Sequence, residues 1–503
     1  MKKIITIAAM LLCSQIALLA GNLAFSKMLG DNMVLQQNAP VTLWGTATPK
    51  ADVAVTGSWN GVTVKVKADK DGHWEAVVNT PAGSFDAQTV KVVSGSETIE
   101  AKNVLIGEVW YCSGQSNMEM TLGGGFGTFV EGSLEEIALS AQYTGVRHIT
   151  IKKATPLEPA WDAEGEWQVC NPVNSPKFSA VAYFFATRLS KALNVPVGVI
   201  NASWGGCFIC PWMSKETLKD YPVNLADATD DSVNNMFKPY VMYNGMFKPV
   251  SKFAINGFIW YQGESNVSTR CDIYADMMNT MVKTWRKDVG RGDIPFLIVE
   301  LAPYDYHDGE YGLQDETGPL LREQQALAAK TIPNAAIIGT NDLAYDFELT
   351  QVHPSQKRQI GERACFMAMN MAYGYTQLPA FHPTVKYATA EGRTVKVYFD
   401  NASTGFRGGE FIEGFEIAGE SGNYHKATTA RTSFSFRGGA CVELECKEVG
   451  EPAFVRYCFH DFQIGNLKGA NGLPAIPFQV KITPASEIPA APMPQRQRTG
   501  NYN

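Results

Sequence analysis

The strongest constraint on the fold is a long apolar run that stops abruptly at a cluster of small polar residues. Residues 104–112 read VLIGEVWYC, and residues 113–117 read SGQSN. A continuous run of β-branched and aromatic residues is typical of a strand buried on both faces. Side chains that follow such a strand lie at the carboxyl end of the sheet, where open α/β sheets place their sites. Ser116 is therefore a candidate nucleophile, although a Ser- and Asn-rich stretch also suits an ordinary turn.

Apolar strands alternate with helical periodicity between residue 104 and about residue 375. The predicted strands cover residues 147–152, 195–201, 254–262, 294–301 and 335–340, and the predicted helices cover 178–193, 273–287, 320–330 and 356–373. This alternation is typical of parallel βαβ units whose sheet is covered by helices on both faces. We therefore expect an α/β domain over residues 104–375.

Segments rich in β-strands are expected on both sides of this domain. Between residues 21 and 103, short alternating runs separated by Gly, Pro and Asp-Gly turns predict a β-sandwich module. Residues 376–485 predict a second β-rich module. Residues 486–503 are rich in Pro, Gln and Arg and predict a loose tail.

The first 20 residues have the pattern of a secretory signal. Lys2 and Lys3 precede an apolar run that ends at Ala20 and is too short to span a bilayer. We expect an exported protein, periplasmic or secreted, without membrane insertion. Loss of the two lysines takes the formal net charge from −7 to about −9. No basic stripe suits nucleic acid, so we expect a small or glycan-sized partner.

The cysteines give little reason to expect a metal site. Removal of the predicted signal, which contains Cys13, would reduce the ten cysteines to nine. An odd number of cysteines means at least one free thiol in an oxidising compartment. Cys207 and Cys210 form a single CxxC pair, which predicts either a local disulfide or two buried thiols. We expect no metal and no other cofactor.

Four short blocks carry a resemblance to a known family. They are GQSNM at 114–118, NASWGG at 201–206, WYQGESN at 260–266 and HPSQK at 353–357. The blocks resemble those of SGNH-type hydrolases and, more narrowly, of the sialate O-acetylesterase family, and they occur in that family's order. Four ordered blocks are more specific than any single one. The resemblance implies an SGNH-type, flavodoxin-like parallel sheet, with Ser116 as nucleophile and His353 as base. His307 is the rival base.

Ester hydrolysis also needs hydrogen-bond donors for the oxyanion that forms. The backbone N–H of Ser116 is one candidate, and Gly206 is the second because a residue without Cβ lets substrate approach the backbone closely. Gly205 is its close rival. The resemblance implies that the side-chain amide of Gln262 completes the oxyanion hole. Glu264, nearby, is expected either to hold the loop of Gln262 or to act directly.

The acid of the catalytic triad is not evident in the sequence. Many SGNH enzymes carry an acid two or three residues before the His, but positions 350 and 351 hold Thr and Gln. Glu348 is the favoured acid because its longer side chain suits the longer offset from His353. Asp342 and Asp346 are its rivals, and a backbone carbonyl is a further way to orient the imidazole.

Together these features predict a metal-independent serine esterase that removes O-acetyl groups from sialic acid through an acyl-enzyme. Acetylated plant polysaccharide, such as xylan, is the alternative substrate. A sialate carboxylate would call for a paired Arg, for which Arg270 and Arg322 are candidates. An alternative from another class is an exported glycan-binding protein with an inactive α/β domain. The presence of both nucleophile and base argues against this alternative.

Overall fold

The structure is a computed structural model, and it describes residues 23–307, 313, 315–407, 411–435, 439–484 and 487. The predicted signal at 1–20 and nearly all of the predicted tail at 486–503 lie outside these residues. The chain divides into two compact units. The first holds the described residues up to Val299 with Leu327–Ala336 and His353–Leu378, and the second holds Glu300–Ala326, Ile337–Val352 and the residues from Pro379 onward.

One long strand, β8 (Glu97–Gly114), organises the first unit. Its first half pairs antiparallel with β7 (Ser84–Ser94). Its second half pairs in parallel with β11 (Val197–Ser203) on one side and β12 (Phe258–Tyr261) on the other. The apolar run at 104–112 is therefore the inner part of a longer strand that continues into the N-terminal β-rich region.

The central part of this sheet contains the predicted α/β strands, with ends that differ from the predicted ones by a few residues. The strand order is β10 (Trp167–Val169), β9 (Val146–Thr150), β11, β8, β12, β13 (Phe296–Val299) and β14 (Ala335–Ile338). β10 runs antiparallel to β9, so the sheet is mixed at this edge. The edge strand β10 was not predicted from the sequence.

The N-terminal strands form a second, smaller sheet and an extension of the first. β1 (Ala24–Phe25), β3 (Pro40–Thr46) and β6 (His73–Asn79) make a three-stranded sheet. β4 (Asp52–Gly57) pairs with β5 (Thr63–Lys67) and β7, and β2 (Val34–Gln36) pairs with β8. Buried residues such as Trp44, Val55 and Val92 lie in these strands.

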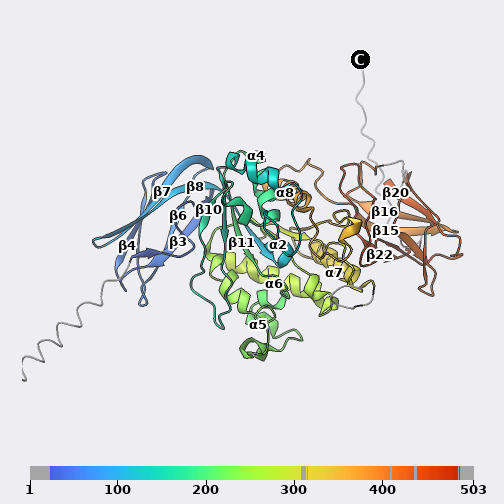
Figure 1. Cartoon of the computed structure of the whole chain (residues 1–503), viewed down its shortest axis with the longest axis horizontal. Helices are drawn as coiled ribbons and strands as arrows, with labels where there is room; N and C mark the ends of the chain where they lie inside the picture. Colours follow the sequence, from blue (N-terminus) through green and yellow to red (C-terminus); the bar gives the residue numbers. More distant parts are fainter. Residues whose placement is uncertain are drawn as a thin grey trace, which may run out of the picture. The chain divides into compact units, whose positions relative to one another are not determined.

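Helices cover both faces of the central sheet, as predicted. Successive side chains of a strand point to opposite faces. Trp110 of β8 contacts Phe185 of α4 (Ala180–Leu193) with ring centroids 5.0 Å apart, and its indole N–H donates to the Tyr373 hydroxyl of α8 (Lys357–Tyr373) at 2.8 Å. The next residue, Tyr111, contacts Trp285 of α6 (Tyr274–Val289) at 5.5 Å. Figure 1 accordingly shows α4 and α8 on one side of β11 and α6 on the other.

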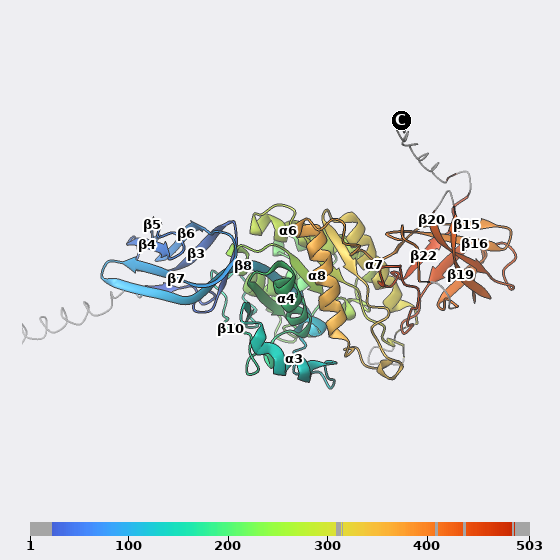
Figure 2. The same ribbon diagram turned by 90° about the horizontal axis from the view of Figure 1, so that it is seen from above.

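Helices α4 and α8 lie side by side, as Figure 2 shows. A Cβ built on Gly361 of α8 would lie 2.6 Å from Phe184 Cβ and 2.7 Å from the Val181 carbonyl oxygen. Glycine is therefore required at this crossing, and the first part of α8 packs closely against α4. The remaining α-helices in the described residues are α2 (Ser116–Glu119), α3 (Ser133–Leu139), α5 (Lys215–Leu218) and α7 (Thr317–Thr331).

The C-terminal part of the second unit contains two four-stranded antiparallel sheets. One has the order β15 (Thr384–Glu391), β16 (Thr394–Asp400), β20 (Gly439–Glu445) and β19 (Thr429–Ser435), and the other β18 (Tyr424–Lys426), β17 (Phe415–Ala418), β21 (Phe454–Tyr457) and β22 (Phe478–Lys481). Residues of both sheets, including Val397, Ile417 and Val455, share one buried core. The β-rich character expected for this region is present.

The nine cysteines in the described residues are all free thiols, and eight of them are buried. Cys207 and Cys210 are therefore two buried thiols, and the alternative of a local disulfide is not what the structure shows. Across the described segments, we find no helix with both the length and the apolar character needed to cross a bilayer.

Candidate active site

The candidate nucleophile lies on a sharp turn where β8 ends. Gly114 has φ 137°, and a Cβ at this position would lie 2.0 Å from the Tyr261 carbonyl oxygen. Only glycine fits there. The chain then enters the short helix α2, which begins at Ser116. Ser116 is 7% exposed, and its Oγ makes no hydrogen bond within the described part of the chain.

Gln115 joins this turn to the loop that follows β12. Its Oε1 accepts hydrogen bonds from Gln262 Nε2 at 3.1 Å and from the Gly263 N–H at 3.2 Å. Its own N–H donates to the Tyr261 carbonyl oxygen at 2.9 Å. The blocks at 114–118 and 260–266 are thus held together at the carboxyl ends of neighbouring strands.

The turn after β11 lies against the nucleophile. A Cβ built on Gly205 would lie 3.4 Å from Ser116 Cβ. The Gly205 N–H donates to Glu119 Oε2 at 2.6 Å, so it is already occupied. By contrast, neither the Ser116 N–H nor the Gly206 N–H donates to an acceptor among the described residues. This geometry favours Gly206 over Gly205 as the second backbone donor to an oxyanion.

The side chain of Gln262 is fully buried and already hydrogen-bonded. Besides Gln115, its Nε2 donates to the Cys207 carbonyl oxygen at 3.0 Å and to Asn266 Oδ1 at 2.9 Å. Its Oε1 accepts from the Tyr274 hydroxyl at 2.7 Å. Because three acceptors share two N–H groups, Gln262 would have to release one of them to reach an oxyanion. Its role as a donor stays a prediction.

We expect Gln262→Ala to lower kcat by roughly 10² to 10³, with a smaller change in KM, because that is the usual effect of removing one oxyanion donor. Steady-state kinetics and a thermal melt of the same preparation check this. A lower melting temperature with kcat within about tenfold of wild type would instead assign Gln262 to holding the loop.

His353, the candidate base, is held beneath an aromatic ring. The rings of His353 and Phe126 stack with centroids 4.6 Å apart and an interplanar angle of 18°. The same Phe126 ring would lie 3.6 Å from a Cβ on Gly205, which places it beside Ser116 as well. Nucleophile, oxyanion turn and base therefore converge around Phe126. This residue was not predicted, although it is the single aromatic residue in the Gly-rich stretch 123–127.

The environment of His353 favours the neutral imidazole. Burial and, second, the ammonium of Lys357 lower the pKa of His353 to about 4. At neutral pH the imidazole is therefore free of the extra proton and can accept one from a serine hydroxyl.

The three candidate acids have different surroundings, and all belong to the second unit. Glu348 is 2% exposed, and its Oε2 accepts the Tyr345 N–H at 2.9 Å. Asp342 Oδ2 pairs with Lys468 Nζ at 2.8 Å. Asp346 is exposed. Glu348 remains the predicted acid, because it is the buried carboxylate nearest to His353 in the sequence.

Comparison with known proteins identifies the family. Residues 106–370, more than half of the chain, match the family described as carbohydrate esterase, sialic acid-specific acetylesterase. The chain belongs to this esterase family. The predicted resemblance is thereby confirmed, and the family is one of carboxylic ester hydrolases.

Individual relatives of this esterase agree with the family match. The sialate O-acetylesterases of Homo sapiens and Pongo abelii are each 30% identical over 387 residues, which is 70% of this chain and 72% of theirs. The crystal structure of a carbohydrate acetylesterase from Xanthomonas citri matches with a TM-score of 0.80 and 30% identity, over 91% of this chain and 99% of that one. The predicted fold class is confirmed by this likeness.

Two of the residues considered for substrate binding or catalysis in this esterase have other contacts. Arg322 is fully buried, and its guanidinium donates to the carbonyl oxygens of Leu301, at 3.0 Å, and Asp461, at 2.8 Å. The suggestion that Arg322 pairs with a substrate carboxylate is therefore wrong. His307, the rival base, is exposed, with its Nδ1 2.7 Å from the Leu313 carbonyl oxygen.

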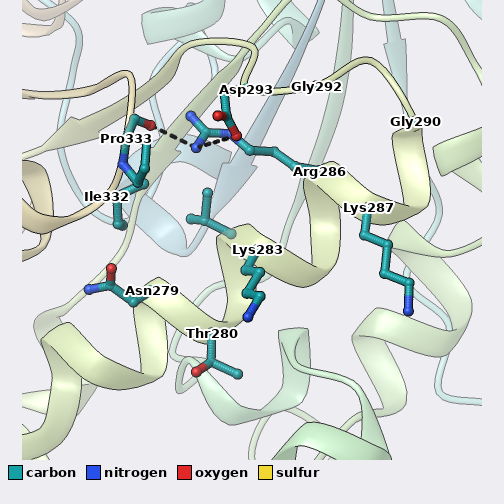
Figure 3. A pocket seen from close by; sticks show the side chains of 11 residues that line it. Asn279, Thr280, Lys283, Arg286, Lys287, Gly290, Gly292, Asp293, Ile332 and Pro333 are labelled. Carbon is teal, nitrogen blue, oxygen red and sulfur yellow. Dashed lines mark hydrogen bonds and ion pairs between the residues drawn. The ribbon is translucent and has the colours of Figure 1, made fainter.

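A cavity of about 650 Å³ lies along α6 (Figure 3). Neither Ser116 nor His353 lines it. Arg286, the most deeply buried cation in its wall, donates to the carbonyl oxygens of Pro333 and Ile294, both at 2.7 Å. Because these carbonyls occupy the guanidinium, Arg286 is not available to an anionic ligand.

Proposed function

We propose that this carbohydrate esterase is a serine esterase that removes O-acetyl groups from sialic acid. The observation that carries the proposal is the convergence of Ser116, the turn at Gly205 and Gly206, and His353 around one aromatic ring. These are the nucleophile, the oxyanion donors and the base that acyl transfer requires. The family match and the names of the relatives support sialic acid as the sugar.

The reaction proceeds in two acyl transfers. Ser116 Oγ attacks the acetyl carbonyl carbon while His353 takes the hydroxyl proton. The N–H groups of Ser116 and Gly206 stabilise the oxyanion. When the C–O bond to the sugar breaks, the His353 imidazolium gives its proton to the departing sugar oxygen. Water, deprotonated by His353, then attacks the acetyl-serine ester and releases acetate and free Ser116.

Acetylated xylan is the alternative substrate, and a direct comparison separates the two. We expect kcat/KM for acetate release to be at least about tenfold higher on O-acetylated N-acetylneuraminic acid than on acetylated xylan, a difference of about 1.4 kcal/mol in transition-state binding. Ser116→Ala supplies the blank for both substrates. A higher kcat/KM on acetylated xylan would agree with the esterase mechanism but would identify xylan, and not sialic acid, as the substrate sugar.

The other proposed class, a glycan-binding protein with an inactive α/β domain, has less support. A Ser116 hydroxyl without hydrogen bonds at a strand end, together with a buried His353 imidazole, is a requirement of catalysis and not of folding. The proposed location is outside the cytoplasm, because the first 20 residues have the pattern of a secretory signal.

A further inference from the structure

A buried side-chain amide joins three of the four blocks. Asn117 directly follows Ser116 and is fully buried. Its Nδ2 donates a hydrogen bond to Glu264 Oε1, and its Oδ1 accepts one from Lys357 Nζ. Glu264 lies in the loop after β12, and Lys357 is the first residue of α8. One amide therefore connects the nucleophile block to the blocks at 260–266 and 353–357.

The lysine and the glutamate at the two ends of this bridge are buried charges. Lys357 is 0% exposed and Glu264 is 2% exposed. Lysine and glutamate are almost never fully buried unless they are paired, because removing an unpaired charge from water is very costly. Burial raises the pKa of Glu264, and the hydrogen bond from Asn117 and the ammonium of Lys357 oppose that rise. Lys357 Nζ also lies 5.4 Å from the centre of the Tyr261 ring. Within the described residues, Glu264 Oε2 has no hydrogen-bond partner.

Both ends of the bridge belong to segments that carry the proposed chemistry. We propose that Glu264, Asn117 and Lys357, hereafter the buried network, position the nucleophile and the base of the esterase and set the charge around the base. The three are positioning residues, since Asn117 acts through Ser116 and Lys357 acts through His353. This inference rests on the proposed function. For Glu264 it means holding the site together and balancing a charge, not reacting with substrate.

The charge of Lys357, which acts on His353, makes the inference testable by pH. Lys357 acts on it from α8, Glu264 lies beyond Asn117 after β12, and Glu119 lies on α2 beside the Gly205 turn. Because the ammonium of Lys357 lowers the pKa of His353, its removal raises that pKa. Protonated His353 cannot act as a base, so the acid limb of kcat/KM then moves to higher pH. Packing alone would lower activity equally at every pH.

The experiment compares pH profiles of kcat/KM for Lys357→Met, Glu264→Gln and the double variant, with a soluble acetyl ester as substrate. We expect Lys357→Met to move the acid limb up by about one pH unit and each single variant to lose about 10²-fold in kcat. The loss in kcat of the double variant should be much smaller than the product of the two single-variant losses, because the double variant leaves no unpaired buried charge. Arg358→Met is the matched control, since this neighbouring cation pairs with Glu136 at 2.9 Å and should leave the limb in place.

Several outcomes would overturn the inference. A wild-type acid limb in both Lys357→Met and the double variant would exclude a charge effect of the buried network on His353. Losses that simply multiply in the double variant would exclude the compensation between Lys357 and Glu264. Failure of the double variant to fold would also exclude this compensation, because a variant that lacks both charges is expected to fold. Activity of Ser116→Ala at the wild-type level would instead refute the proposed function itself.

Discussion

Ser116→Ala is expected to abolish ester hydrolysis while the fold is retained. Loss of the nucleophile costs about 10⁶-fold in kcat in serine hydrolases that depend on it. The fold should survive because Ser116 Oγ makes no hydrogen bond within the described part of the chain, so its removal leaves no buried partner unsatisfied. Acetate release and a thermal melt of the purified variant check both parts of the prediction.

Ser113 provides the matched control for this variant. It lies three residues before Ser116, near the end of β8, but its Oγ donates to the Ala202 carbonyl oxygen at 2.6 Å, which is a structural contact between β8 and β11. We therefore expect Ser113→Ala to lower the melting temperature and to keep kcat within about tenfold of wild type. Hydrolysis by Ser116→Ala at close to the wild-type rate would end the proposal that Ser116 is the nucleophile.

Glu348→Gln is expected to lower kcat by several orders of magnitude, comparable to the roughly 10⁴-fold loss when a triad acid is changed to its amide. A buried carboxylate orients the imidazole and stabilises the imidazolium that forms. Glutamine keeps an oxygen that can accept the Tyr345 N–H, so the turn at residues 345–348 should persist. The variant therefore tests the negative charge of Glu348 and not the local fold. Steady-state kinetics measure the loss.

Two further variants, in which a carboxylate is changed to its amide, identify the triad acid if Glu348 does not orient His353. A large loss in Asp342→Asn would assign the role to Asp342 and would mean that its pairing with Lys468 is compatible with catalysis. Asp346→Asn serves as the control, because the exposed Asp346 side chain is expected to contribute little. If all three amides keep kcat within about tenfold of wild type, His353 is oriented without a triad carboxylate, by a backbone carbonyl or by Gln351.

The central strand was predictable because burial on both faces leaves a plain signal in the sequence. Residues 104–112 are apolar apart from Glu108, and Trp110 and Tyr111 among them contact helices on opposite faces of the sheet. The earlier residues of the same strand, 97–103, alternate between polar and apolar, because there β8 belongs to the β-rich N-terminal region. This change of pattern within one strand is why the boundary between the N-terminal module and the α/β domain was predicted at residues 103 and 104.

The contacts within the site could not be predicted in the same way. Local composition gives no sign that Lys357, a residue type almost always exposed, is fully buried against a side chain 240 positions away. Gln262 was assigned by resemblance to the oxyanion hole, but its hydrogen bonds to Gln115 and Cys207 depend on how the segments after β8, β11 and β12 meet. Such polar networks follow from tertiary packing, which neither periodicity nor spacing encodes.

The most direct test of the serine mechanism is to identify the residue that carries the acetyl group during turnover. Rapid acid quench of the enzyme with an activated acetyl ester, followed by peptide mass spectrometry, would show it. We predict acetylation at Ser116 in the wild type, with none in Ser116→Ala, and labelling of the same serine by an organophosphate reagent. Acetylation or organophosphate labelling at another residue, in an enzyme that is turning over, would contradict the assignment of Ser116 and move the active site elsewhere.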